Sequence, residues 1–167
     1  MYKNTLYIMC GAPGAGKSTF AKKWFQKNQN IKYISRDEIR FKLVKENEPY
    51  FSREKEVWNI FIQSIQLALD EGFDVIADAT HLNKISRFKL YSHLNMNNTI
   101  AAAVVIPATL ETCIAHNEAR KGTRSYVPER VLINMYYKFI YPDLENELYL
   151  YAVYNVGAEG HVSKIIR

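Results

Sequence analysis

The sequence has little cysteine and no long apolar run, and each absence excludes a class of protein. Only Cys10 and Cys113 occur in its 167 residues, inside apolar segments and without metal-binding spacing. They exclude a disulfide framework and a zinc-finger-like site, and they indicate free thiols in a reducing, cytoplasmic compartment. No stretch approaches about eighteen consecutive apolar residues, so no membrane span is expected. The early strand-like segment Leu6–Met9 is shorter than a signal-peptide core.

A strong charge of one sign is also lacking. The chain has 22 Lys and Arg against 17 Asp and Glu, a net charge of +5. A surplus this small suits an anionic partner such as a nucleotide or a nucleic acid, but it does not require one. The 48% apolar content is enough for one core, and no repeat or linker divides the chain. We therefore expect a single domain over residues 1–167, with no interface signature that fixes an oligomeric state.

Short apolar runs alternate with longer helix-like segments along the chain. The expected strands are Thr5–Met9, Ile31–Ile34, Val75–Ala77, Ala101–Ile106 and Ala152–Val156. The expected helices are Ser18–Lys27, Ser52–Glu71 with Ser52 as N-cap, Asn83–Leu94, Thr109–Arg120 and Pro128–Tyr141, and after Glu145 a closing helix with one or two strands. This alternation predicts an α/β fold with a mostly parallel central sheet flanked by helices. Ligands of such sheets bind at the carboxyl ends of the strands.

A glycine-rich loop between the first strand and the first helix matches G-x-x-x-x-G-K-[ST] in full. Its residues are Gly11, Ala12, Pro13, Gly14, Ala15, Gly16, Lys17, Ser18 and Thr19. Glycines let consecutive backbone N–H groups surround a phosphate, and the following helix adds its positive end. Lys17 can reach the β- and γ-phosphates, and the Ser18 hydroxyl can ligate magnesium. The loop predicts a P-loop NTPase fold that binds ATP and Mg²⁺, with water, a metabolite, a nucleotide or a polymer as the acceptor.

The second expected strand is followed by Ser35-Arg36-Asp37-Glu38-Ile39-Arg40. Asp37 could take a proton from an attacking hydroxyl, as a kinase base does. Arg40 lies three residues further on, on the same side of a nascent helix, and could hold a phosphate of the acceptor. The local alternative is that Ser35 or Asp37 caps the helix and the charges are solvated.

The third expected strand ends at Asp78, beside the strand that leads into the P-loop. This is the place of a Walker-B carboxylate, which could bind magnesium through water or orient an arginine in the substrate site. The alternative is an N-cap for the helix that begins near Asn83, although Thr80 or Asn83 suits that role better. His81 has no assigned role.

A basic segment, Arg120-Lys121-Gly122-Thr123-Arg124, separates the last two expected helices. We expect a small basic lid at about residues 120–127, whose cations neutralise phosphate charge as its glycine hinge closes. The alternative is a solvated cluster favoured by the end of a helix. Phe51 and Trp58 could line an acceptor groove, but core packing is the preferred interpretation for both.

Together, these residues resemble the kinase domain of phage polynucleotide 5′-hydroxyl kinases over Leu6 to Pro142. The likeness rests on four ordered blocks: Gly11–Thr19, Ser35–Arg40, Val75–Arg87 and Arg120–Val131. It implies transfer of the γ-phosphate of ATP to the 5′ end of DNA or RNA, with Asp37 as general base. Arg40 would bind the phosphate on the 3′ side of the acceptor nucleotide. The acceptor side would further include Asp78, Thr80 and Arg87, and the lid would supply Arg120, Lys121 and Arg124 to ATP, with Arg120 and Arg124 also catalytic.

The sequence departs from that family in two places. Ala79 stands where the phage enzymes have an acid before the threonine, and Lys121 stands where an arginine is expected. The phosphatase or ligase domain that often accompanies such kinases is not expected here. Two other functions remain open: a P-loop kinase acting on a nucleoside, nucleotide, small metabolite or aminoacyl-tRNA, and a binding module gated by ATP.

Overall fold

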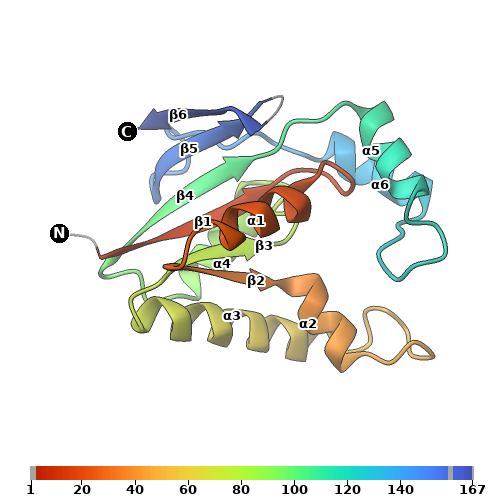
Figure 1. Cartoon of the computed structure of the whole chain (residues 1–167), viewed down its shortest axis with the longest axis horizontal. Coiled ribbons are helices and arrows are strands. Elements are labelled where there is room, and N and C mark those ends of the chain that lie inside the picture. Colours follow the sequence, from red (N-terminus) through yellow and green to blue (C-terminus); the bar gives the residue numbers. More distant parts are fainter. Residues whose placement is uncertain (1–2, 158–159, 167) are drawn as a thin grey trace.

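The computed structural model describes residues 3–157 and 160–166 and is built around a six-stranded sheet (Figure 1). The strand order is β2-β3-β1-β4-β5-β6, with parallel pairing throughout except between β5 and β6. The strands are β1 (Asn4–Cys10), β2 (Ile31–Ser35), β3 (Asp74–Asp78), β4 (Thr99–Val105), β5 (Leu150–Val156) and β6 (Val162–Ile166). The expected α/β fold with a mostly parallel sheet is therefore confirmed.

Helices cover both faces of this sheet (Figure 1). They are α1 (Lys17–Gln26), α2 (Arg36–Leu43), α3 (Glu54–Asp70), α4 (Lys84–Ser92), α5 (Leu110–Glu118) and α6 (Glu129–Tyr137). On one face, Phe61 and Ile65 of α3 and Leu90 of α4 pack with Leu6 and Ile8 of β1. The other face carries Ala21 of α1, Cys113 of α5 and Leu132 of α6, which pack in one cluster with Met9 of β1 and Ile76 of β3.

The central strand β1 shows why a parallel sheet forms here. Leu6, Ile8 and Cys10 belong to one core and Met9 to the other, and all four are fully buried. A strand with apolar side chains on both faces needs helices on both sides, which crossover connections supply. Cys10 and Cys113 are free and buried, and burial raises the pKa of the Cys10 thiol to about 12.

Three details differ from the expectations. The helix α3 begins at Glu54, so Ser52 lies two residues before it and Arg53 occupies the N-cap without a side-chain bond. The helix α6 ends at Tyr137, four residues earlier than expected. The described residues after Glu145 contain no α-helix, so the expected closing helix was wrong there, although β5 and β6 both form.

The expected single domain of residues 1–167 includes positions 1, 2, 158, 159 and 167, which lie outside the described part of the chain. Within the described part, none of the helices has both the length and the apolar character needed to cross a membrane.

Candidate active site

The P-loop lies between β1 and α1 and contacts α5 through Gly14. The imidazole Nδ1 of His116 is 2.8 Å from the carbonyl oxygen of Gly14. Gly14 itself has φ +81°, and a Cβ built on it would lie 2.4 Å from the carbonyl oxygen of Cys113. The loop therefore needs glycine at this position for two reasons, a left-handed backbone and a close approach to α5.

Replacing Gly14 by alanine should destabilise the protein by roughly 2–5 kcal/mol, the sum of a left-handed alanine and an overpacked contact. Gly72→Ala is the matched control, because Gly72 also has a positive φ, +88°, but nothing within 4 Å of its built Cβ. It should show only the backbone cost, about 1–2 kcal/mol. Denaturant unfolding of both variants measures the difference. Equal losses would contradict a tight contact between the loop and α5.

Lys17 is buried at the start of α1, with 8% of its surface exposed. Its ammonium group donates a hydrogen bond of 2.8 Å to the carbonyl oxygen of Ala12, inside the same loop. Burial lowers the pKa of Lys17, and the carboxylates of Asp78 and Asp37 oppose that shift. The loop thus holds a desolvated cation where an anionic ligand would gain most from it.

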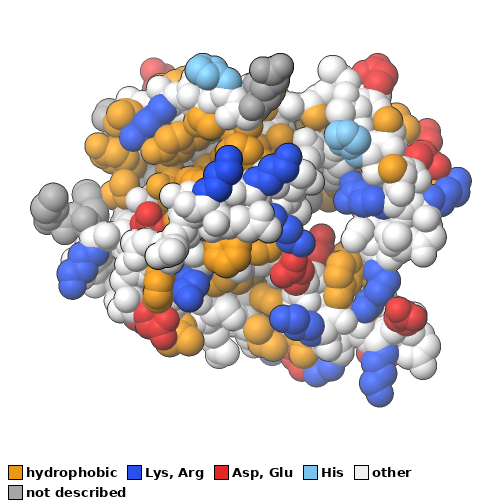
Figure 2. All heavy atoms as spheres, in the orientation of Figure 1, with side chains coloured by type: hydrophobic (Ala, Val, Ile, Leu, Met, Phe, Trp, Pro, Cys, Tyr) orange, Lys and Arg blue, Asp and Glu red, His pale blue; other side chains and the backbone are white. Residues whose placement is uncertain are grey.

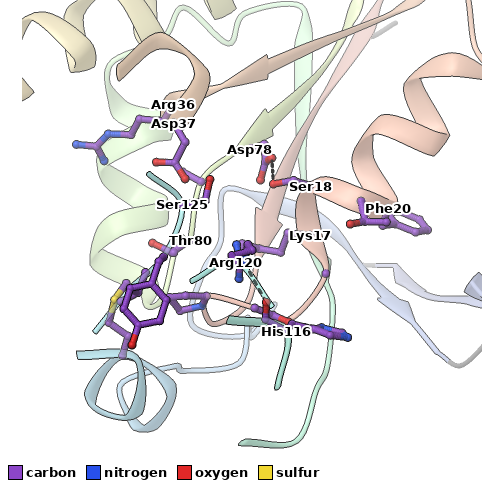
Figure 3. Close-up of a pocket in the computed structure, with 18 of the residues that line it drawn as sticks. Lys17, Ser18, Phe20, Arg36, Asp37, Asp78, Thr80, His116, Arg120 and Ser125 are labelled. Atoms are coloured by element: carbon purple, nitrogen blue, oxygen red, sulfur yellow. Dashed lines mark hydrogen bonds between the residues drawn. The ribbon is translucent and has the colours of Figure 1, made fainter. Parts of the chain in front are cut away.

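Asp78 ends β3 and faces the P-loop. The Ser18 hydroxyl donates a 2.6 Å hydrogen bond to Asp78 Oδ2, and the Tyr33 hydroxyl donates another of 2.6 Å to the same oxygen. Burial and the neighbouring Asp78 raise the pKa of Tyr33, so its phenol stays protonated and donates. Figure 3 shows the contact between Ser18 and Asp78 at the cavity. Asp78 therefore contacts Ser18 of the P-loop, and its described contacts do not include Arg40.

Asp37 and Arg40 form a separate cluster on the first turns of α2. The Arg40 guanidinium contacts Asp37 Oδ1 and donates to Glu54 Oε1 at 2.5 Å and to the Tyr50 hydroxyl at 3.1 Å. Burial alone would lower the pKa of Arg40, but the hydrogen bond with Glu54 and the nearby carboxylates raise it. Arg40 is 4% exposed, whereas the Asp37 side chain is 62% exposed. A fixed guanidinium and an accessible carboxylate thus stand side by side.

On α2, Ser35 caps the helix and Asp37 contacts Arg40. The Ser35 hydroxyl accepts a hydrogen bond from the backbone N–H of Glu38, so Ser35 is the N-cap of α2. Asp37 is thereby free of the capping role and bonds to Arg40 and Tyr50 instead. The Tyr50 hydroxyl donates to Asp37 at 3.1 Å, which adds a second fixed neighbour to the carboxylate.

The lid residues have three different environments. Arg124 donates to the carbonyl oxygens of Phe41 at 3.0 Å and Val44 at 2.6 Å, which ties the lid to the end of α2. Arg120 lines the cavity, and its buried Nη2 atom has no partner among the described residues. Lys121 is exposed, pairs with Glu118 at 3.2 Å and is not among the cavity-lining residues, contrary to its expected contact with ATP.

Arg87 is the second residue whose position disagrees with the expectation. It is fully buried and forms a two-pronged ion pair with Glu147, with Nε–Oε2 and Nη2–Oε1 distances of 2.8 and 2.6 Å. It also donates to the backbone carbonyl oxygens of His81 and Ile140. Burial of His81 lowers its pKa to about 4, so this imidazole is neutral. Arg87 therefore joins α4 to the segment before β5 and is not among the residues that line the cavity around the P-loop.

Arg87→Met should cost roughly 3–5 kcal/mol of unfolding free energy, because it leaves the Glu147 carboxylate buried without its partner. Combining it with Glu147→Met should recover part of that loss, since the unpaired charge is then removed. Denaturant unfolding measures both, with Lys84→Met on the exposed side of the same helix as a control that should change little. A large rise in the acceptor KM at unchanged stability would instead restore the acceptor role.

The P-loop, Asp78, the Asp37 cluster and the lid line one cavity of about 1600 Å³. Figure 3 shows Asp37, at the start of α2, and Asp78, at the end of β3, beside the cavity. Figure 2 shows basic side chains over α1 and the lid side. The predicted residues that line it are Pro13, Gly14, Gly16, Lys17, Ser18, Thr19, Asp37, Arg40, Asp78, Thr80, Arg120 and Arg124. Gly11, Ala12 and Ala15 of the loop are buried and are not among the lining residues. The volume exceeds the 300–1000 Å³ usual for one small ligand, so donor and acceptor can be bound together.

Four residues of the site were not found from the sequence. Tyr33, Tyr50, Glu54 and His116 all contact predicted site residues. Tyr50, Glu54 and His116 also line the cavity, whereas Tyr33 is not among its lining residues. Tyr33 had a weak local signal, because it lies in the expected strand just before the Ser35–Arg40 segment. Glu54 had no local signal, because it lies in an expected helix to which no chemistry was assigned and its partner Arg40 is 14 residues away. His116 had none, since its partner in the P-loop is 102 residues away in the sequence.

Comparisons with known proteins identify the family of the chain. The family model described as AAA domain matches residues 6–142. L-seryl-tRNA(Sec) kinase of Methanococcus maripaludis is 32% identical over 142 residues, covering 82% of this chain and 53% of that protein. The chain thus spans about half the length of this curated relative.

Two solved structures share the fold. A chain of the Pnkp1/Rnl/Hen1 RNA repair complex superposes with a TM-score of 0.71 at 21% identity, over 83% of this chain and 44% of that one. Kti12 of Chaetomium thermophilum, in complex with ADP-AlF3, superposes with a TM-score of 0.70 at 17% identity, over 92% and 89%. At these identities the likeness shows a common architecture.

Proposed function

The chain belongs to the AAA domain family and carries a P-loop kinase domain, and we propose that this domain transfers the γ-phosphate of ATP to the 5′-hydroxyl of a DNA or RNA end. The observation that carries the proposal is the cluster on α2. Asp37, accessible and bonded to the buried Arg40, lines the same cavity as the P-loop. A base beside a fixed phosphate-binding arginine suits an acceptor that presents a hydroxyl next to a phosphodiester.

In the proposed reaction, Asp37 takes the proton of the 5′-hydroxyl as that oxygen bonds to the γ-phosphorus. The bond from the γ-phosphorus to the bridging oxygen breaks, and ADP leaves. Lys17 and the P-loop N–H groups hold the β- and γ-phosphates, and Arg120 brings a free N–H to the charge that develops in transfer. Arg40 holds the phosphate on the 3′ side of the acceptor nucleotide and so places its hydroxyl against Asp37.

The residues fit a magnesium ion with the nucleotide. Ser18 and Asp78 offer oxygen ligands, which are the donors that Mg²⁺ prefers. The Ser18 hydroxyl oxygen lies 2.6 Å from Asp78 Oδ2. Among residues 3–157 and 160–166, no group of three or more His, Cys, Asp or Glu could hold a metal ion alone. Mg²⁺ usually takes one or two protein ligands and completes its shell with water and substrate phosphates. When bound, the ion would neutralise phosphate charge.

A second candidate is an aminoacyl-tRNA kinase, favoured by the 32% identity to L-seryl-tRNA(Sec) kinase. In that case Asp37 would deprotonate the hydroxyl of the aminoacyl group, and the cavity would bind the 3′ end of the tRNA. The fold, the P-loop and the base keep their roles in both candidates, so only the acceptor separates them.

Transfer of labelled γ-phosphate from ATP with Mg²⁺ tests the proposal. The acceptor panel is 5′-hydroxyl DNA and RNA oligonucleotides, nucleoside 3′-monophosphates, nucleosides, 5′-monophosphates and seryl-tRNA, each with an EDTA control. Label on the oligonucleotides or on 3′-monophosphates is the expected result. Label confined to seryl-tRNA, or to nucleosides and 5′-monophosphates, would replace the proposed acceptor. ATP binding without any labelled product would favour the ATP-gated module.

A further inference from the structure

Phe51 has an environment that core packing does not explain. It was expected in the core, but 68% of it is exposed, and it lines the active-site cavity beside Arg40, Tyr50 and Asp37. The segment that carries it, between α2 and α3, is held in place. Ser52 N–H donates to the carbonyl oxygen of Pro49 at 2.9 Å, and Arg53 donates to that of Leu43 at 2.8 Å. A large apolar ring is thus fixed at the acceptor side with much of its surface in water.

The ring is anchored to the catalytic cluster through Tyr50. The two rings meet edge to face, with centroids 4.7 Å apart and an interplanar angle of 89°. Tyr50 in turn bonds to both Asp37 and Arg40. The Arg40 guanidinium carbon lies 5.5 Å from the Phe51 centroid. The general base, the phosphate-binding arginine and the aromatic ring therefore lie within reach of one nucleotide.

We propose that Phe51 is the platform on which the nucleobase of the 5′-terminal acceptor nucleotide stacks. This inference rests on the proposed function and deepens it by adding a third contact. A nucleotide presents a hydroxyl, a phosphate and a flat base on one sugar, and Asp37, Arg40 and Phe51 match these three groups. Every base has a π-face, so stacking gives affinity with little preference for sequence. A small polar metabolite would leave the ring uncovered.

The test compares two acceptors that differ only in the base: a nucleoside 3′-monophosphate and the corresponding abasic sugar 3-phosphate with a free 5′-hydroxyl. Phe51→Ala should raise the KM for the nucleotide roughly 10-fold, within the range measured for lost base stacking. The KM for the abasic acceptor and both kcat values should stay within about 2-fold of the parent protein. Phe51→Trp should restore the nucleotide KM, whereas Phe51→Leu should not, because it keeps apolar area but has no π-face.

The control variant is Phe88→Ala. Phe88 is an exposed phenylalanine, 53% exposed, but it lies on α4 and is not among the residues lining this cavity. It should leave both KM values unchanged. An equal effect of Phe51→Ala on both acceptors, or full activity in Phe51→Leu, would overturn the stacking platform while the kinase activity stands. If Phe51→Ala weakened phosphate transfer to seryl-tRNA alone, Phe51 would not be the platform for the 5′-terminal base.

A binding measurement keeps the inference testable if the parent protein transfers no phosphate to nucleotides. In Phe51→Trp, addition of a nucleoside 3′-monophosphate should change the indole fluorescence beyond the change seen in the parent protein, and inorganic phosphate should not. No transfer but a clear fluorescence change would contradict the proposed reaction and support the base subsite. Neither transfer nor a fluorescence change would overturn both.

Discussion

Lys17→Met should lower kcat by at least roughly 10³-fold, the scale on which a cation at a transferring phosphoryl group acts. The unliganded variant should be no less stable than the parent protein. Burial lowers the pKa of Lys17 in the folded protein, so its charge is held at a cost that methionine does not carry. Methionine has a similar length and loses only the hydrogen bond to Ala12. Labelled-phosphate transfer and thermal unfolding without nucleotide measure the two effects.

Lys23→Met is the matched control for this variant. Lys23 lies on the same helix and also lines the cavity, but it is exposed. Its charge is solvated and screened, so its removal should change kcat by less than about 3-fold. A Lys17→Met variant that folds and keeps a tenth of the parent kcat would contradict the phosphate-binding role of Lys17. An equal loss in both variants would indicate a general dependence on positive charge around α1.

Most of the sheet could be predicted because its central strands are buried on both faces. Each becomes a short apolar run, and the expected Val75–Ala77 lies within the observed Asp74–Asp78. The strand β6 had no such signal, since Val162–Ile166 is exposed along its length and lies at the edge of the sheet, paired with β5. Its existence depends on a neighbouring edge, which a local pattern does not report.

The predicted site residues differ from the missed ones in how far away in the sequence their partners lie. The P-loop and the pair of Asp37 and Arg40 lie on single turns of chain, so their spacing alone brings them together. Glu54 contacts Arg40 from 14 residues away, and Tyr33 contacts Asp78 from 45. Those contacts depend on how α3 and β2 pack, which a single sequence does not specify. Arg87 shows the reverse case, a plausible site arginine whose partner Glu147 lies 60 residues away in the core.

Glu54 gives Arg40 the carboxylate partner that the resembled kinases have at the position of Ala79. The sequence has no acid immediately before Thr80, where the resembled kinases have a partner for the acceptor-binding arginine. Here Glu54 accepts from Arg40 at 2.5 Å and from Arg36 at 2.9 Å, so α3 supplies a carboxylate for that guanidinium. The pKa of Glu54 is lowered because the hydrogen bond and charge of Arg40 outweigh its burial. The Arg40 guanidinium thereby has a carboxylate partner without an acid at position 79.

Asp37→Asn should lower kcat by roughly 10²–10⁴-fold, the contribution of a positioned general base. The acceptor KM should change little. The amide oxygen of asparagine can still accept from Arg40 and Tyr50, so the cluster on α2 keeps its geometry. It cannot take the proton of the attacking hydroxyl. Steady-state kinetics at saturating ATP, with kcat and the acceptor KM determined separately, distinguish a lost base from lost binding.

Two further variants define what the loss means. Asp37→Ala should lower kcat similarly and also raise the acceptor KM, because Arg40 then loses one of the contacts that hold it. Glu38→Gln neutralises the next residue of α2, whose carboxylate pairs with Lys22 at the surface, and should leave both constants within about 2-fold. Full activity in Asp37→Asn would exclude Asp37 as the base. A large rise in KM without a fall in kcat would make it a binding residue, since only an interaction confined to the transition state lowers kcat alone.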